Sequence, residues 1–198
     1  MSRADGARTK ERILECALPL FAEHGFAGTS IRMISSAASV NVATLAYHFE
    51  GKEGLYRATV ERLHHDLNAD WPQDPPTPGA DYVAYFVQKG WDFAKSHKTH
   101  IRLALRHVLD SERHPDVIYE DWSFMELDRA SQVLAMVRPD MDPAERRFVV
   151  LSVVHLTVRF LLEDPGQLAA MLGTEDDLDA VVVRYLSNLL KRQLGLPA

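Results

Sequence analysis

The chain has 198 residues, of which 46% are hydrophobic and 25% are charged, and its formal net charge is −6. This composition can fill a core in one or two domains and excludes a small scaffold that depends on disulfides. The single cysteine, Cys16, excludes an internal disulfide, and the polar first ten residues show no signal peptide, so we expect a cytoplasmic protein.

The charge is unevenly distributed along the chain. Residues 1–57 contain seven Lys or Arg and six Asp or Glu, which gives +1, so the remainder carries −6 − 1 = −7. An acidic protein can still bind nucleic acid if one end alone approaches it. The charge therefore permits a nucleic-acid partner but does not indicate one.

An amphipathic helix is predicted over residues 9–24, with a glycine stop at Gly25. Its inward positions are Ile13, Leu14, Ala17, Leu20 and Phe21. Pro19 lies inside it and predicts a kink. The basic residues Arg3, Arg8 and Lys10 precede or open the helix, and they can form either an arm that contacts DNA or a solvated tail.

Two short helices and a tight turn are predicted next. Thr29 and Ser30 are helix-starting residues, and Ile31, Ile34, Ala37 and Ala38 follow at helical spacing until Ser39 interrupts them. Asn41 can cap a second helix from Val42, in which Leu45 and Phe49 face inward. Two short helices joined in this way make a helix-turn-helix, whose second helix can enter the major groove of DNA.

The second helix leaves a face free for such a contact, formed by Ala43, Thr44, Tyr47 and His48. Lys52 opens the following helix, where free backbone N–H groups and a lysine together favour a phosphate. We expect Tyr47, His48 and Lys52 to contact phosphates, and Arg32, Ala43 and Thr44 to face the bases. Together with Asn41, these residues form the predicted DNA-binding set.

Phe21, Gly25, Phe26, Thr29, Ser30 and the run TLAYHFEGKEGLY resemble the N-terminal domain of TetR-family transcriptional regulators. The resemblance implies a three-helix DNA-binding head in residues 1–57 and a larger helical ligand-binding and dimerisation body in residues 58–198. The chain departs from the family pattern at two positions. Ser39 stands where glycine is usual, and Ala46 stands where an aromatic residue is usual, which weakens the transfer of detailed base contacts.

The rest of the chain has helical periodicity and no alternation typical of strands, so the fold class is all-α. A helix over residues 52–71 is followed by the proline-rich loop WPQDPPTPGA, residues 71–80. Asp142 should cap one of the later helices, and Thr174 with Asp177 resembles a capping box. The later helices are predicted over residues 81–97, 100–110, 115–137, 143–162 and 174–194.

The last two long helices are too apolar for the surface of a monomer. Residues 148–162 are apolar almost all round, and a wide stripe on the next helix comprises Leu178, Val182, Tyr185, Leu186, Leu189 and Leu190. We expect a homodimer in which two helices from each subunit form a four-helix arrangement. A membrane span is not expected, because the apolar run is short and contains His155 and Arg159.

A small-molecule pocket is expected between the helices of the body. Candidate walls are Phe86, Trp91, Leu105, Trp122, Phe124 and Met125, and a polar stripe contains Ser152, His155 and Arg159. The apolar residues can equally be plain core. The polar stripe can line either the pocket or the seam of the dimer.

Enzyme motifs are missing from the sequence: it has no phosphate-binding glycine loop, no GxSxG turn and no paired cysteines. We expect no enzyme activity, no cofactor and no metal ion. The alternative is an all-α interaction or metal-sensing protein that uses His97, His100, His107 and His114, which recur at helical offsets. The preferred hypothesis is a homodimeric transcriptional regulator, a repressor, that binds a palindromic DNA operator and is released by a small-molecule effector.

Overall fold

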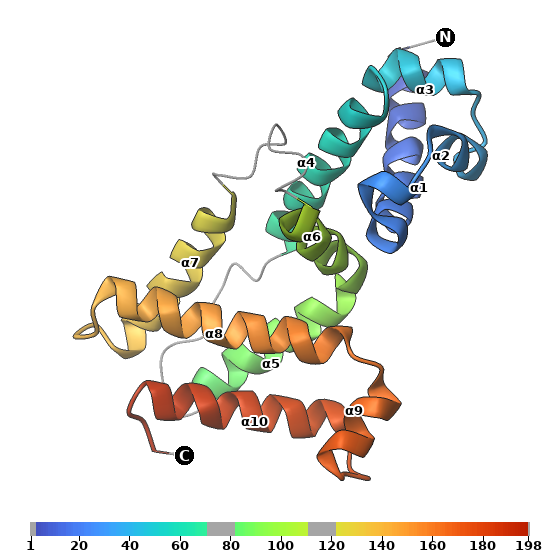
Figure 1. Cartoon of the computed structure of the whole chain (residues 1–198). Helices are drawn as coiled ribbons and strands as arrows, with labels where there is room; N and C mark the ends of the chain where they lie inside the picture. Colours follow the sequence, from blue (N-terminus) through green and yellow to red (C-terminus); the bar gives the residue numbers. More distant parts are fainter. Residues whose placement is uncertain (1–2, 71–81, 111–121, 198) are drawn as a thin grey trace. The chain divides into compact units, whose positions relative to one another are not determined.

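The computed structural model describes residues 3–70, 82–110 and 122–197 (Figure 1). These residues form ten α-helices and no strand, so the all-α prediction is confirmed. The helices are α1 (Arg3–Gly28), α2 (Ile31–Ala37), α3 (Val42–Phe49), α4 (Lys52–Asp70), α5 (Tyr82–Ser96), α6 (Lys98–Asp110), α7 (Trp122–Val137), α8 (Pro143–Leu162), α9 (Pro165–Leu172) and α10 (Leu178–Gln193).

The helices fall into two compact units, each with its own core. The first unit, the head, contains α1 to α4 and, from Thr99, α6. The second unit, the body, contains α5 and α7 to α10. The sequence did not reveal that α6 groups with the helix-turn-helix, because α5 separates α6 from α4 along the chain.

Helix α1 is longer than predicted, and its backbone breaks at the predicted glycine stop, Gly25. It begins at Arg3, so Arg8 and Lys10 are helical rather than part of an arm, and Arg8 pairs with Asp5 at 2.8 Å. The backbone leaves helical geometry at Gly25 (φ 71°, ψ 177°) rather than at Pro19. Gly25 is therefore the residue that ends the long straight part of the helix, as its ability to adopt positive φ predicts.

Thr29 fixes this end of α1 by a buried hydrogen bond. Its hydroxyl donates to the Gly25 carbonyl oxygen at 2.7 Å, and the side chain is almost fully buried. The N-cap of α2 is the next residue, Ser30, whose hydroxyl oxygen accepts from the Met33 amide at 3.2 Å. Of the two predicted helix-starting residues, one is a core hydrogen-bonding group and the other is the cap.

The head is held together by an aromatic cluster between α1 and α4. The ring of Tyr56 meets that of Phe21 edge-on at a centroid distance of 4.9 Å and that of Phe26 at 5.2 Å. The Tyr56 hydroxyl also lies 3.1 Å from Nδ1 of the buried His107 on α6. This hydrogen-bonded contact helps to hold α6 in the head.

In the body, α10 packs against α5 and α8, and α8 packs against α7. The side of α10 that contains Val182, Leu186 and Leu190 is buried within the protomer. Leu186 is therefore a core residue, and its place in the predicted dimer stripe is corrected. The predicted stripe includes too many residues, because α10 buries one side within its own subunit and only its other side can face a partner.

Three aspartates cap helices of the body. Asp142 accepts from the Ala144 amide at 2.8 Å and Asp164 from the Gln167 amide at 2.9 Å, so the predicted cap at Asp142 is present. The N-cap of α10 is Asp177, not Thr174, because the Asp177 carboxylate accepts from the Asp179 amide. The predicted start of a helix after Pro115 lies outside the described residues, and the described part begins at Trp122.

No helix within the described ranges is long and apolar enough to cross a membrane. This includes α8, the most apolar candidate in the sequence.

Candidate nucleic-acid interface

The turn between α2 and α3 is formed by a serine in a left-handed conformation. Ser39 has φ 50°, and its amide donates to the Ser36 carbonyl oxygen at 3.1 Å. The amide of Val40 donates to the Ser35 carbonyl oxygen at 3.0 Å, which closes α2. Glycine is usual at this position in TetR-family regulators. Ser39 adopts the left-handed conformation that glycine would adopt, and its Cβ makes that conformation somewhat strained.

Asn41 begins α3 and orients its first turn. Its side-chain oxygen accepts from the Thr44 amide at 2.6 Å and from the Thr44 hydroxyl at 2.8 Å. The oxygen is therefore committed to capping, as in other helices with Asn at this position. The side-chain amide group of Asn41 and the lone pairs of the Thr44 hydroxyl remain for an external partner, since Asn41 is exposed and Thr44 is half-buried.

Helix α3 has one buried side and one exposed side. Leu45 and Phe49 are buried in the head, as predicted, whereas Ala43 and Ala46 are exposed. The Tyr47 side chain is 84% exposed, which is unusual for a residue with a large apolar ring. Small residues beside one projecting tyrosine give a surface that can approach another molecule closely.

His48 is only half-buried, but its Nε2 atom is enclosed and has no hydrogen-bond partner in the described part of the chain. A Cβ added at Gly6 of α1 would lie 4.0 Å from His48 Cε1, so α1 covers this side of the ring. The predicted phosphate contact of His48 would therefore use its Nδ1 atom.

Lys52 lies at the first position of α4 but is not a free surface lysine. Its ammonium group lies 4.4 Å from the centroid of the Phe26 ring and 3.5 Å from the Ala27 carbonyl oxygen. Burial lowers the pKa of Lys52 from its ordinary value. The lysine links α4 to the end of α1, so its structural role accompanies any contact with a phosphate.

Two contacts that shape this surface were not predicted from the sequence. Lys10 of α1 places its ammonium group 5.7 Å from the centroid of the Phe49 ring, and it brings a cation to the end of α3. Gly54 brings α4 into close contact with α3, because a Cβ there would lie 1.9 Å from the Phe49 carbonyl oxygen. A glycine within the first turn of a predicted helix was the available signal for this close contact. Arg32 of α2, which was predicted, is exposed.

Comparison with known proteins identifies this arrangement. Residues 13–59 match the family described as bacterial regulatory proteins, tetR family. The head is a TetR-family helix-turn-helix domain. Its matched range runs from the first buried residue of α1, Ile13, to the buried Thr59 of α4.

Curated relatives of the TetR-family head are transcriptional regulators. The chain is 46% identical over 56 residues to the probable HTH-type transcriptional regulator YttP of Bacillus subtilis, covering 28% of this chain and 27% of YttP. It is 30% identical over 103 residues to the HTH-type transcriptional repressor SCO4008 of Streptomyces coelicolor, covering 52% and 51%. The chain thus spans about half or less of the length of these curated relatives.

Solved structures with the TetR-family fold cover nearly the whole chain. A TetR-family regulator from Mesorhizobium loti has a TM-score of 0.71 with 15% identity and covers 98% of both chains. The multidrug binding protein EbrR, in complex with malachite green, has a TM-score of 0.64 with 19% identity and covers 96% of this chain and 98% of EbrR. At these identities the likeness shows the fold alone.

The described residues that were predicted to line a pocket belong to both units. Trp91 of α5 is buried in the body and Phe86 is half-buried, whereas Leu105 is a partly exposed residue of α6 in the head. The side chains of Trp122, Phe124 and Met125 lie outside the described residues. Leu105 thus belongs to a different unit from Phe86 and Trp91, and the pocket stays a prediction.

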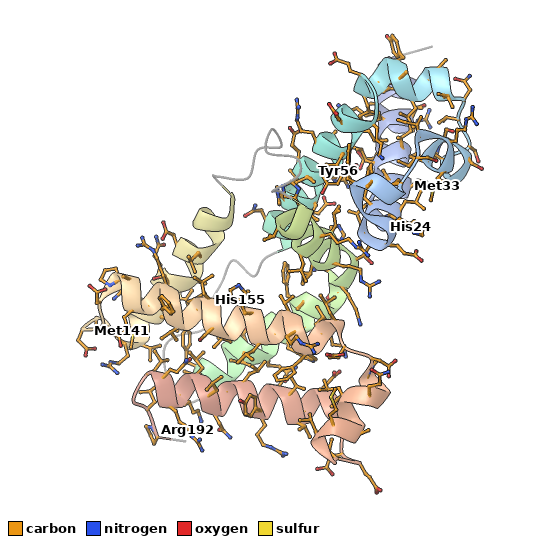
Figure 2. All side chains as sticks on the ribbon, viewed as in Figure 1. His24, Met33, Tyr56, Met141, His155 and Arg192 are labelled. Atoms are coloured by element: carbon orange, nitrogen blue, oxygen red, sulfur yellow. The ribbon has the colours of Figure 1, made fainter. Side chains whose placement is uncertain are left out.

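The polar stripe on α8 faces outward. His155 and Arg159 are exposed, and Arg159 forms an ion pair with Glu163 one turn later (Figure 2). Ser152 instead lies between helices, where its hydroxyl accepts from the Gln193 side-chain amide of α10 at 3.2 Å.

The histidines of the metal-sensing alternative lie in separate environments. Nδ1 of His97 lies 2.9 Å from the Phe93 carbonyl oxygen, and Nε2 of His100 lies 3.6 Å from Asp66. His107 contacts Tyr56, and His114 lies outside the described residues. Within the described ranges, no group of three or more His, Cys, Asp or Glu side chains could hold a metal ion.

Proposed function

We propose that this chain is a ligand-responsive transcriptional repressor that binds a palindromic DNA operator as a homodimer. The observation that carries the proposal is the exposed side of α3. There the small residues Ala43 and Ala46 lie near the exposed Tyr47, and Asn41 caps the start of the helix. A helix with such a surface fits the major groove. The curated relatives of the chain are transcriptional regulators. The proposed role is therefore that of a cytoplasmic DNA-binding protein and not of an enzyme.

The DNA contacts divide into two kinds in this proposal. Ala43, Thr44 and Arg32 face the base edges or the floor of the groove, whereas Tyr47 and Lys52 contact phosphates. Asn41 and His48 are assigned to the same interface through the side-chain amide of the former and Nδ1 of the latter. Lys10, which lies at the end of α3, is a further cation for the DNA backbone. Phosphate contacts raise affinity for every sequence, and base contacts create preference for one.

The dimer is proposed to form through the outward sides of α8 and α10. Phe148 is 77% exposed, and Leu151, Val154 and Tyr185 are also exposed. Tyr185 packs edge-on against Phe160 of α8 at 6.1 Å, so the two helices present one joint surface. Burying this apolar surface against its symmetric copy would stabilise a two-fold dimer. His155 and Arg159 lie on the same side of α8, and we therefore assign them to the seam rather than to a pocket.

The response to a small molecule is proposed from the architecture and from the ligand-bound EbrR, which shares the fold. Each recognition helix must reach its own half-site, so an effector that changes the spacing of the two heads would weaken both contacts together. Thermodynamic linkage requires such an effector to bind the operator complex more weakly than the free dimer. The factor is the same as that by which the effector weakens operator binding.

A selection from random DNA duplexes tests the proposed function. The full chain should enrich one palindromic sequence, and its affinity should fall steeply with salt because phosphate contacts release counterions. Lys52→Ala should weaken binding to all duplexes and reduce the salt slope by about one unit. Enrichment of no sequence, together with salt-independent retention, would contradict the proposal.

A further inference from the structure

The exposed side of α3 is formed by four positions on one side of the helix. They are Val42, Ala43, Ala46 and Tyr47. At about 3.6 residues per turn, these positions fall within a single arc of about 140° around the helix axis. The half-buried Thr44 and His48 follow on the edge of the arc next to Tyr47. The surface that α3 presents is therefore one continuous strip.

The chemistry of this strip limits which bases it can recognise. Three of its four side chains, those of Val42, Ala43 and Ala46, are hydrocarbon. Bidentate hydrogen bonds to guanine require arginine or lysine, and those to adenine require asparagine or glutamine. The α3 sequence VATLAYHF contains none of these four residue types. Helix α3 itself therefore cannot make the commonest hydrogen-bonded contacts that identify a base.

Asn41, which precedes α3, is already engaged within the head. Its side-chain oxygen accepts from the amide of Thr44 at 2.6 Å and from the Thr44 hydroxyl at 2.8 Å. A bidentate contact with adenine needs both the oxygen and the NH2 group of an asparagine. Asn41 would lose its cap if it made that contact. The hydrogen-bonding groups at the start of α3 thus serve mainly to fix the helix.

Hydrocarbon side chains can still recognise one feature of the major groove, the C5-methyl group of thymine. Ala43 and Ala46 are short, so they allow the backbone of α3 to approach the base edges closely. Residues three apart on a helix have Cβ atoms about 5–6 Å apart. Successive base pairs are about 3.4 Å apart along the duplex, so the two alanine methyls match bases that are one or two steps apart.

We infer that Ala43 and Ala46 recognise the 5-methyl groups of two thymines within three consecutive base pairs of each operator half-site. This inference rests on the proposed function, because it assigns a base chemistry to the proposed DNA-binding surface. Tyr47, at the edge of the strip, keeps its assignment to a phosphate. Phosphate contacts position the protein, whereas the two alanines determine the sequence preference of α3.

Cations near the strip favour DNA as its occupant. Lys10 holds its ammonium group 5.7 Å from the centroid of the Phe49 ring, at the last residue of α3. Lys52 holds its ammonium group 4.4 Å from the Phe26 ring, and Arg32 on α2 is exposed. The major groove places uncharged base edges between two phosphate backbones. An apolar strip with cations nearby is complementary to that arrangement.

Replacing thymine by deoxyuridine tests the inference, because the change removes only the methyl group and keeps every hydrogen-bonding group of the base pair. The duplex that the full chain selects from random DNA is prepared with each thymine of one half-site replaced in turn. Replacement of either contacted thymine should lower affinity roughly fourfold, the factor expected for one buried methyl group. Replacement of the other thymines should leave affinity unchanged.

Ala43→Gly and Ala46→Gly remove the corresponding methyl groups from the protein. Each variant should lose the preference for thymine over deoxyuridine at one position and keep it at the other. A general loss of stability cannot produce that pattern, and the retained preference shows that the variant is folded. Ala170→Gly, the same change at an exposed position of α9, should keep both preferences.

The outcomes separate this inference from the proposed function. Full affinity for every deoxyuridine duplex, or a selected half-site without two such thymines, would overturn the inference, while specific binding would still support the proposed function. Both thymine preferences unchanged in folded Ala43→Gly and Ala46→Gly proteins would also overturn it. Enrichment of no sequence would overturn both.

Discussion

Gly54 of α4 lies so close to Phe49 of α3 that a Cβ on the glycine would be 1.9 Å from the Phe49 carbonyl oxygen. The same Cβ would be 3.0 Å from the Phe49 carbonyl carbon. Backbone atoms cannot move aside as a flexible side chain can. The recognition helix is thus positioned by direct contact of its last residue with the first turn of α4.

Gly54→Ala should therefore destabilise the head by about 2–3 kcal/mol, because the added methyl forces the two helices apart. Gly90→Ala is the matched control, since it also replaces a helical glycine but its Cβ would meet no described atom within 4 Å. The control should leave stability unchanged or raise it by up to about 1 kcal/mol. Urea unfolding of both variants provides the comparison, and equal stabilities would refute the close-contact argument.

Ser39→Gly should stabilise the head by about 0.5–1 kcal/mol, because Ser39 has φ 50° and glycine adopts this conformation without strain. Ser36→Gly, in the last turn of α2, should have the opposite effect because glycine is a poor helix former. Thermal unfolding can be followed for both proteins. A decrease in melting temperature for Ser39→Gly would show that the serine side chain contributes more than its backbone strain costs.

The stability of the head should depend on pH through His64. Burial, together with the charge of His107, lowers the pKa of His64 to about 4. The unfolded chain takes up this proton near pH 6.5, whereas the folded chain resists it until about pH 4. Stability is therefore fully present above pH 6.5 and is lost as the pH falls toward 4, by about 2 kcal/mol after a discount for partial exposure of the ring.

Urea unfolding at pH 7 and pH 4.5 measures this effect. His64→Gln should reduce the difference between the two pH values, whereas His24→Gln, at an exposed position, should leave it unchanged. An unchanged pH dependence in His64→Gln would assign the effect to another group.

Phe148→Glu should convert the dimer into a folded monomer, because the side chain is exposed in the protomer and is proposed to be buried between subunits. Met171→Glu on α9 places the same charge at another exposed apolar position and should leave the dimer intact. Sedimentation velocity distinguishes the two states. A Phe148→Glu protein that remains dimeric would place the interface elsewhere.

The helix-turn-helix could be predicted from sequence because its signals are local. Asn41 caps α3 as expected, and Leu45 and Phe49 are buried on the expected side. The left-handed conformation of Ser39 agrees with the glycine that is usual at this position in TetR-family regulators. Each of these features depends on residues within one or two turns, where spacing and capping chemistry decide the structure.

Features that depend on distant residues could not be predicted. Lys52 lies over Phe26, which is 26 positions earlier, and nothing in its own neighbourhood in sequence indicates that contact. Leu186 and Tyr185 both belong to an apolar stripe, but only the packing of α10 against α5 and α8 decides that one is buried and the other exposed. Thr174 and Asp177 can both cap the last helix, and the sequence pattern does not show which of them does so.

The DNA affinity of Ala43→Asp tests the central claim most directly. Ala43 is exposed in the first turn of α3, where a carboxylate is compatible with the helix dipole, so the fold should be retained. The same carboxylate would face the negatively charged groove and should lower affinity for the selected operator at least ~100-fold. Ala170→Asp, at an exposed position of α9, should bind the operator like the unaltered chain. Equal operator affinity for the two folded variants would contradict the account, because DNA would then be bound by a surface other than α3.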